Sequence, residues 1–118
     1  MIDVSVTLSE EGVIENLMAE GHAGFALKGT DIVCAAFTIL LRTFARAVEA
    51  SPGVTWTARD DDPDRFRLAV TGVSSESAEK YRGWCEFLLR GLEDLKGDDP
   101  SRVRIEYGIH SGRLFHGS

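Results

Sequence analysis

The residues best suited to chemistry lie between positions 21 and 38, where a cysteine follows a histidine. Cys34 stands three residues after Asp31, and both Thr30 and Asp31 are residue types that cap the start of a helix. A helix that begins there places Cys34 in its first turn, where unpaired backbone N–H groups and the helix dipole favour an anion. Such a position lowers the pKa of a thiol below its free value of about 8.5 and increases the nucleophilic thiolate fraction.

The same cysteine has a second interpretation. It stands between Val33 and Ala35 in an apolar series, and cysteine at such a place is often a small buried hydrophobic residue. Its position alone leaves the choice between nucleophile and packing residue open.

His22 lies twelve residues before Cys34, on a segment that leads directly into the predicted helix. A loop of this length can fold back over the helix start and bring the imidazole within hydrogen-bond distance of the sulfur. The residues around it are Gly21, Ala23 and Gly24. Glycines in this loop permit positive φ and a close approach to a substrate backbone, although the segment is also compatible with an ordinary connection.

Asp31 likewise has two interpretations. It is most simply the helix cap, which is the common use of aspartate at such a place. Its carboxylate is also placed to orient or charge the His22 imidazole as a third group.

Hydrophobic periodicity predicts the elements that hold these residues. Strands are expected over residues 2–8, 13–20, 54–58, 66–70 and 103–107, with helices from Thr30 or Asp31 and from Ser74 or Ser75. Each helix has an apolar stripe, and Cys85 lies inside the second one. Two helices packed on one face of a mostly antiparallel sheet of about five strands would hide both stripes, which predicts an α+β fold.

The length fits one α+β domain over residues 1–107, followed by a loosely packed tail over residues 108–118. With 43% hydrophobic and 27% charged residues, the composition is that of a globular protein. The net charge is −6 and the basic residues are scattered, which argues against nucleic-acid binding. We find no apolar run of about 18 residues and no signal peptide, so no membrane contact and a cytoplasmic location are expected.

Metal and cofactor sites are also not expected. Two cysteines are too few for a disulfide framework. No CxxC or HxxxH spacing joins Cys34 or Cys85 to His110 or His116, and no glycine-rich nucleotide motif occurs. Trp56 and Trp84 belong to amphipathic patterns and are expected in the core or at a dimer contact.

Residues 21–24 read GHAG, and residues 31–36 read DIVCAA. This pair of strings resembles the signature of the bacterial ribosomal-processing cysteine protease family Prp, in which GHAG precedes D-[IV]-[VI]-C-A-[AG] across a short loop. The order of predicted elements is similar to the small α+β fold of that family over nearly the whole domain.

The resemblance implies that Cys34 is the nucleophile, that His22 is the general base and that Asp31 takes the acidic position of the motif. Thr38 stands where the family usually has serine, a change that keeps the hydroxyl. Family members remove a short N-terminal extension from the twenty-seventh protein of the large ribosomal subunit, cutting after aromatic residues, and they resemble homodimers. Such a substrate is a basic protein segment, and the mechanism requires no cofactor.

Two other functions are compatible with the same residues. A noncatalytic protein could bind a ribosomal protein or an assembly intermediate with the same loop and groove. Cys34 could instead serve as a redox-sensing thiol, which also requires an activated sulfur.

Overall fold

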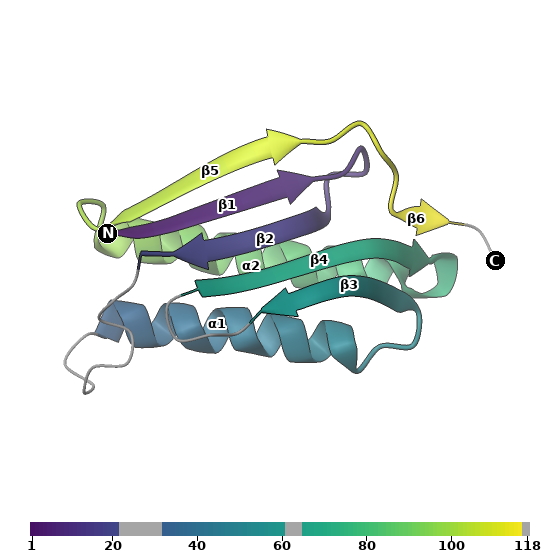
Figure 1. Cartoon of the computed structure of the whole chain (residues 1–118), viewed down its shortest axis with the longest axis horizontal. Helices are drawn as coiled ribbons and strands as arrows, with labels where there is room; N and C mark the ends of the chain where they lie inside the picture. Colours follow the sequence, from purple (N-terminus) through teal and green to yellow (C-terminus); the bar gives the residue numbers. More distant parts are fainter. Residues whose placement is uncertain (22–31, 61–64, 117–118) are drawn as a thin grey trace.

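The computed structural model describes residues 1–21, 32–60 and 65–116. The elements are β1 (Ile2–Leu8), β2 (Ile14–Glu20), α1 (Ile32–Glu49), β3 (Val54–Asp60), β4 (Arg65–Ser74), a single 3-10 turn (Ser75–Ser77), α2 (Ala78–Asp98), β5 (Val103–Ile109) and β6 (Phe115–His116). Apart from β6, this order confirms the predicted one (Figure 1). The predicted caps of the first helix, Thr30 and Asp31, lie outside the described residues.

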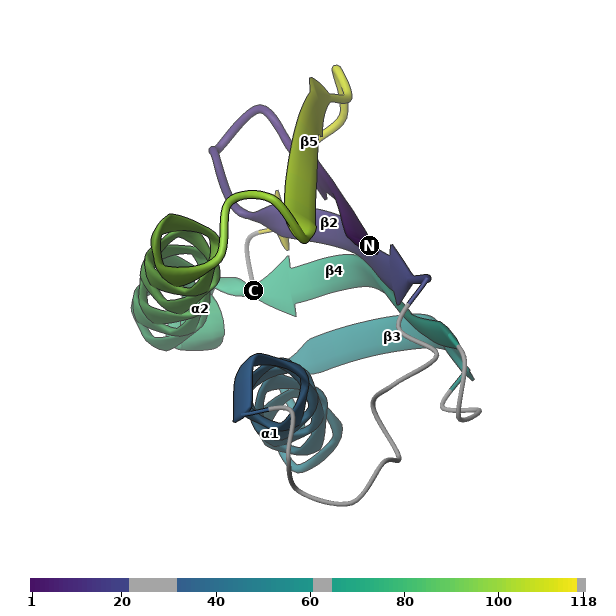
Figure 2. The same ribbon diagram turned by 90° about the vertical axis from the view of Figure 1, so that its left-hand side faces the viewer.

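The strands form one sheet in the order β3-β4-β2-β1-β5, and β6 pairs with β4 outside this path. Three pairs are antiparallel, namely β1 with β2, β2 with β4 and β3 with β4, whereas β1 pairs with β5 and β4 with β6 in parallel. Both helices cover the same face of the sheet (Figure 2). The predicted α+β class, with two helices on one face of a mostly antiparallel sheet, is therefore confirmed.

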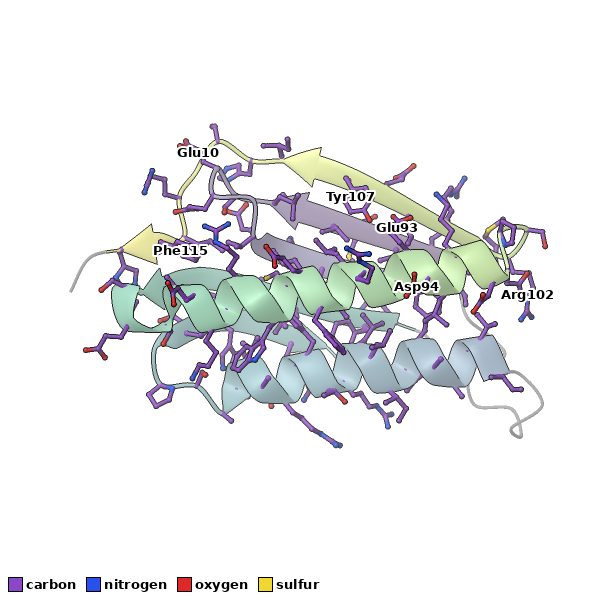
Figure 3. The ribbon with its side chains drawn as sticks, turned by 180° about the vertical axis from the view of Figure 1, so that it is seen from behind. Glu10, Glu93, Asp94, Arg102, Tyr107 and Phe115 are labelled. Atoms are coloured by element: carbon purple, nitrogen blue, oxygen red, sulfur yellow. The ribbon has the colours of Figure 1, made fainter. Side chains whose placement is uncertain are left out.

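The core lies between this face and the two helices. Alternate strand residues point into it, because successive side chains of a strand project to opposite faces, and the inward stripes of α1 and α2 close it. Buried members from the strands include Val4, Val6, Leu17, Leu68 and Val70, and those from the helices include Phe37, Leu41, Val48, Tyr81, Cys85 and Leu92. Tyr107 adds a polar link from β5 to α2, because its hydroxyl donates to Oε2 of Glu93 at 2.5 Å (Figure 3).

The C-terminal segment differs from the prediction of a loose tail. β5 extends to Ile109, and β6 pairs with β4 through Val73 and Phe115. Leu114 is only 3% exposed. The prediction is thus wrong for residues 108–116, because this segment is held by contacts to residues distant in sequence, which leave no local periodic pattern.

Candidate functional site

Cys34 is the third residue of α1, in its first turn. The backbone N–H groups of this turn have no partner within the helix, and the positive end of the helix dipole lies here. The side chain is 4% exposed and belongs to the hydrophobic core cluster. The predicted position of Cys34 at the helix start is confirmed. The structure also agrees with the alternative prediction that Cys34 is buried.

Thr38 lies one turn further along α1. Its hydroxyl Oγ1 donates a hydrogen bond to the backbone carbonyl of Cys34 at 3.0 Å. Side-chain hydroxyls that bond to the carbonyl four residues earlier add a second donor to that group. Thr38 is therefore tied to the turn that carries the sulfur, and its contact is with the backbone of Cys34.

The structure describes only some of the other predicted site residues. His22, Ala23, Gly24 and Asp31 lie outside the described residues. The pairing of His22 with Cys34 and the two roles of Asp31 therefore stay predictions.

Gly21, directly before His22, is described. It has φ +82°, and a Cβ built on it would lie 2.5 Å from the carbonyl oxygen of Met1. Both the left-handed backbone and this close approach require glycine. The segment that leads to His22 thus leaves β2 against the start of β1.

Cys85 provides the contrasting thiol. It is 1% exposed on α2 and accepts a hydrogen bond from the N–H of Ile14 at 3.4 Å. The hydroxyl of Tyr81, also on α2, donates to the carbonyl of the same Ile14 at 2.5 Å. Burial raises the pKa of the Cys85 thiol to about 11. It is therefore a structural thiol, protonated at neutral pH and a weak nucleophile.

The two C-terminal histidines lie away from Cys34. Nδ1 of His110 is 3.0 Å from Oε2 of Glu15, beside a hollow of about 440 Å³ that Thr7, Asn16 and Arg113 also line. His116 belongs to β6. Over residues 1–21, 32–60 and 65–116, no three His, Cys, Asp or Glu side chains gather into a metal site.

Glu11 lies between β1 and β2 and is not among the site residues predicted from the sequence. Its side chain is 7% exposed, and Oε1 accepts hydrogen bonds from the Ser9 hydroxyl at 2.7 Å and the Leu114 N–H at 3.0 Å. Oε2 accepts from the Phe115 N–H at 2.9 Å. Burial alone would raise the pKa of Glu11, but these hydrogen bonds hold it at about 2. No local sequence signal identifies the link to the C-terminal segment, since the Leu114 and Phe115 N–H groups lie more than 100 residues away.

The start of α1 and the end of β2 share one end of the molecule, whereas β6 and the β1–β2 turn lie at the other (Figure 1). Cys34 is thus separated from the Glu11 cluster by most of the length of α1. Among the described helices, none is long and apolar enough to cross a membrane.

Comparisons with known proteins agree with this architecture. The family model described as cysteine protease Prp matches residues 1–104. The ribosomal processing cysteine protease Prp of Staphylococcus aureus is 23% identical over 111 residues, which span 91% of this chain and 99% of that protein.

Solved structures have the same fold. A crystal structure of SMU.848 from Streptococcus mutans is 26% identical with a TM-score of 0.74, covering 93% of this chain and 96% of that one. The ribosomal processing protease Prp from S. aureus, bound to a covalently linked product peptide, is 22% identical with a TM-score of 0.73, covering 91% and 99%. A complex of the S. aureus protease with a substrate peptide has a TM-score of 0.71 at 21% identity, again covering 91% and 99%. The match over residues 1–104 shows that this chain belongs to the cysteine protease Prp family.

Proposed function

We propose that the chain is a cysteine endopeptidase in which Cys34 is the nucleophile and His22 the general base. The observation that carries this proposal is the position of Cys34 in the first turn of α1, inside the region that matches the family model. The second thiol, Cys85, is a poor alternative because burial raises its pKa to about 11. Asp31 either caps α1 or orients the imidazole of His22.

In the proposed reaction, the Cys34 thiolate attacks the scissile carbonyl, and backbone N–H groups at the start of α1 stabilise the oxyanion. His22 gives its proton to the leaving amine as the C–N bond breaks, which leaves a thioester on Cys34. Water, deprotonated by His22, then hydrolyses the thioester to a carboxylate and restores the thiol. Each oriented N–H donor to the oxyanion contributes roughly 3 kcal/mol.

The substrate we propose is the N-terminal extension of the twenty-seventh protein of the large ribosomal subunit. Relatives named ribosomal processing cysteine protease support this choice, as does the S. aureus complex with a substrate peptide. A net charge of −6 suits the basic N-terminal end of a ribosomal protein. The same proposal includes a cytoplasmic enzyme with a single catalytic domain that works as a homodimer.

The test is cleavage of a peptide that contains this extension. Cys34→Ala and His22→Ala are expected to lose cleavage, whereas Cys85→Ala, with its thiol on the other helix, is expected to keep it. Far-UV circular dichroism and thermal unfolding check that all three variants fold. Undiminished cleavage by Cys34→Ala would refute the proposed mechanism.

The burial of Cys34, at 4% exposure, favours a second candidate, a noncatalytic protein that binds the ribosomal segment with the same loop and groove. Binding measured by isothermal titration separates the two candidates. A binding protein retains the peptide intact at stoichiometric ratios, whereas the protease releases two fragments over many turnovers.

A further inference from the structure

β5 forms one edge of the sheet. It pairs in parallel with β1, and none of the strands in residues 1–21, 32–60 and 65–116 pairs with its other flank (Figure 1). Its pairing with β1 runs along the whole strand without a shift in register. β3, at the opposite edge, has two register shifts against β4 between Thr55 and Ala58. Irregularities of this kind protect an edge from the addition of further strands, so β5 is the more open of the two edges.

Alternate backbone groups of β5 point away from β1. At the end of the pairing, the N–H of His110 donates to the carbonyl of Leu8 at 2.8 Å. Because alternate residues of a strand turn their N–H and C=O groups to the same neighbour, the even-numbered residues of β5 face β1. The groups of Tyr107 and Ile109 therefore face the free flank. No group in the described part of the chain forms a hydrogen bond with the backbone of these two residues on that flank.

The apolar side chains of β5 continue beyond the buried core. Val103 and Ile105 are 3% and 8% exposed, whereas Tyr107 is 48% and Ile109 80% exposed. The four residues alternate along the strand, so their side chains share the face of the sheet that packs on the helices. In the second half of β5, unpaired backbone groups and exposed apolar side chains thus occur together, which is the combination that favours strand addition. We call residues 106–109 the docking edge.

Acidic side chains lie on both sides of Tyr107. Glu93 of α2 accepts the hydrogen bond from its hydroxyl (Figure 3). The adjacent Glu106 is exposed and projects to the opposite face of the sheet. Arg104 is the one cation of β5, and it is already paired with Asp3 at 2.7 Å. The docking edge is therefore acidic, in a molecule whose net charge is −6, and it suits a basic partner.

A second copy of this chain is a poorer occupant of the docking edge. Two β5 strands paired about Tyr107 would bring Glu93 and Glu106 of both copies together, and like charges on neighbouring strands are destabilising. An extended basic segment forms the same backbone hydrogen bonds and replaces this repulsion by attraction. The charges thus favour a different protein over a copy of the same one.

We propose that the docking edge binds an extended, basic segment of another protein, which adds to the sheet as a strand beside β5. Backbone groups of the segment bond to those of Tyr107 and Ile109, and its apolar side chains, at alternate positions, pack on these two residues. Lysine or arginine side chains at the intervening positions face Glu106. This contact is separate from Cys34, so it goes beyond the proposed peptidase activity.

The experiment titrates the full chain into the labelled peptide acetyl-KVKIKVK-amide and follows binding by fluorescence anisotropy. Ile109→Pro removes an N–H on the free flank and is expected to weaken binding about ten-fold, the order of a lost hydrogen bond. Ile109→Ala keeps this N–H and is expected to lose less. Met18→Ala is the control, since Met18 is 36% exposed on β2, away from the edge. Circular dichroism checks that each variant folds.

Two further measurements test the charge and the strand pairing. Glu106→Lys is expected to weaken binding of the lysine peptide and to improve binding of acetyl-EVEIEVE-amide. Amide hydrogen exchange followed by NMR gives the pairing directly. The amides of Tyr107 and Ile109 are expected to exchange more slowly when the lysine peptide is bound, whereas the amide of Gly108, which faces β1, changes little.

Undiminished binding of the lysine peptide by Ile109→Pro would overturn the docking edge, as would unchanged exchange at Tyr107 and Ile109. Equal affinity of the wild type for the lysine and glutamate peptides would overturn the basic partner. Self-association of the wild type that Ile109→Pro abolishes would assign the edge to a second copy and also overturn the proposal. The peptidase is judged separately, by cleavage with the Cys34→Ala variant, so either proposal can fail alone.

Discussion

The N–H of Phe115 donates a hydrogen bond to Oε2 of Glu11 at 2.9 Å, across a sequence separation of 104 residues. The same carboxylate binds the Leu114 N–H and the Ser9 hydroxyl. Arg82 of α2 reinforces the contact, because its Nη1 donates to the Glu11 carbonyl at 2.8 Å and its guanidinium lies 5.2 Å from the centre of the Phe115 ring. One acidic residue thus joins the β1–β2 turn to the C-terminal segment.

Replacement of this carboxylate by an amide tests its importance. Glu11→Gln is expected to lower the free energy of unfolding by about 1–3 kcal/mol, because hydrogen bonds to a charged acceptor are stronger and an amide also presents an unmatched NH₂ group. Urea unfolding followed by circular dichroism gives the value. Glu10→Gln, at an exposed neighbouring position, is the control and is expected to change stability little. Equal effects of the two substitutions would contradict the assigned role.

The Glu11 carboxylate is expected to make the stability depend on pH. The pKa of Glu11 is lowered from 4.5 to about 2 in the folded state, so between these values the unfolded chain binds more protons than the folded one. The stabilisation by Glu11 is therefore complete above about pH 4.5 and is lost as the pH falls toward about 2. Unfolding measured from pH 6 to pH 2.5 should show a steeper loss for the wild type than for Glu11→Gln. Parallel curves for the two proteins would show that another titrating group dominates the loss of stability at low pH.

Tyr81 and Tyr107 form a matched pair of phenols. Tyr81 is fully buried and its hydroxyl donates to the Ile14 carbonyl, whereas Tyr107 is 48% exposed and donates to Glu93. Tyr81→Phe is expected to cost about 1–3 kcal/mol of unfolding free energy, because it leaves a buried carbonyl without this partner. Tyr107→Phe should cost less than about 1 kcal/mol, since water can replace the lost contact. Thermal unfolding of both variants provides the comparison.

Alkylation tests whether Cys85 is inert. Its pKa of about 11 results mainly from burial, so native protein at pH 8 should react with iodoacetamide far more slowly than a free thiol. In a Cys34→Ala background, mass spectrometry reads this thiol alone. Labelling is expected to follow global unfolding as urea is added. Rapid labelling without urea would show that α2 opens locally.

Substitutions of Thr38 are expected to have graded effects on the proposed cleavage. Its hydroxyl bonds to the carbonyl of Cys34, so Thr38→Ser should keep activity and the nearly isosteric Thr38→Val should lose about ten-fold in kcat/KM, the order expected when a hydrogen bond of about 1.4 kcal/mol is removed. A loss confined to kcat would indicate misplacement of the thiol. Equal activity of the serine and valine variants would show that the Thr38 hydroxyl does not contribute to cleavage.

Sequence reasoning succeeded where the physical cause is local. The alternation in residues 2–8 predicted β1, and the stripe that contains Cys85 predicted the buried side of α2. The helix start at Cys34 also followed from neighbouring residues. The role of His22 stays a prediction, because it lies outside the described residues.

Sequence reasoning failed where the structure depends on contacts between residues that are distant in the chain. The pairing of Leu114 and Phe115 with Glu11 has no periodic signature, so the segment was predicted to be loose. The strand order does not follow from the sequence for the same reason, since alternation tells which side of a strand is buried and not which strand lies beside it. The exposure of Ile32 and Ile39 on α1 is not predicted either, because residues 32–41 include no charged side chain that would mark the solvent side of the helix.

The position of β1 between β2 and β5 constrains how the chain is made. Ile2 pairs with Val103 and Leu8 with Ile109, so one flank of β1 stays unpaired until β5, which follows much later in the chain, has been synthesised. Contacts of such long range slow folding, and an uncovered strand edge invites association with other chains in the meantime. A nascent copy would therefore complete this sheet only after β5 has left the ribosome, which protects neighbouring proteins from premature proteolysis if the proposed activity requires the complete fold.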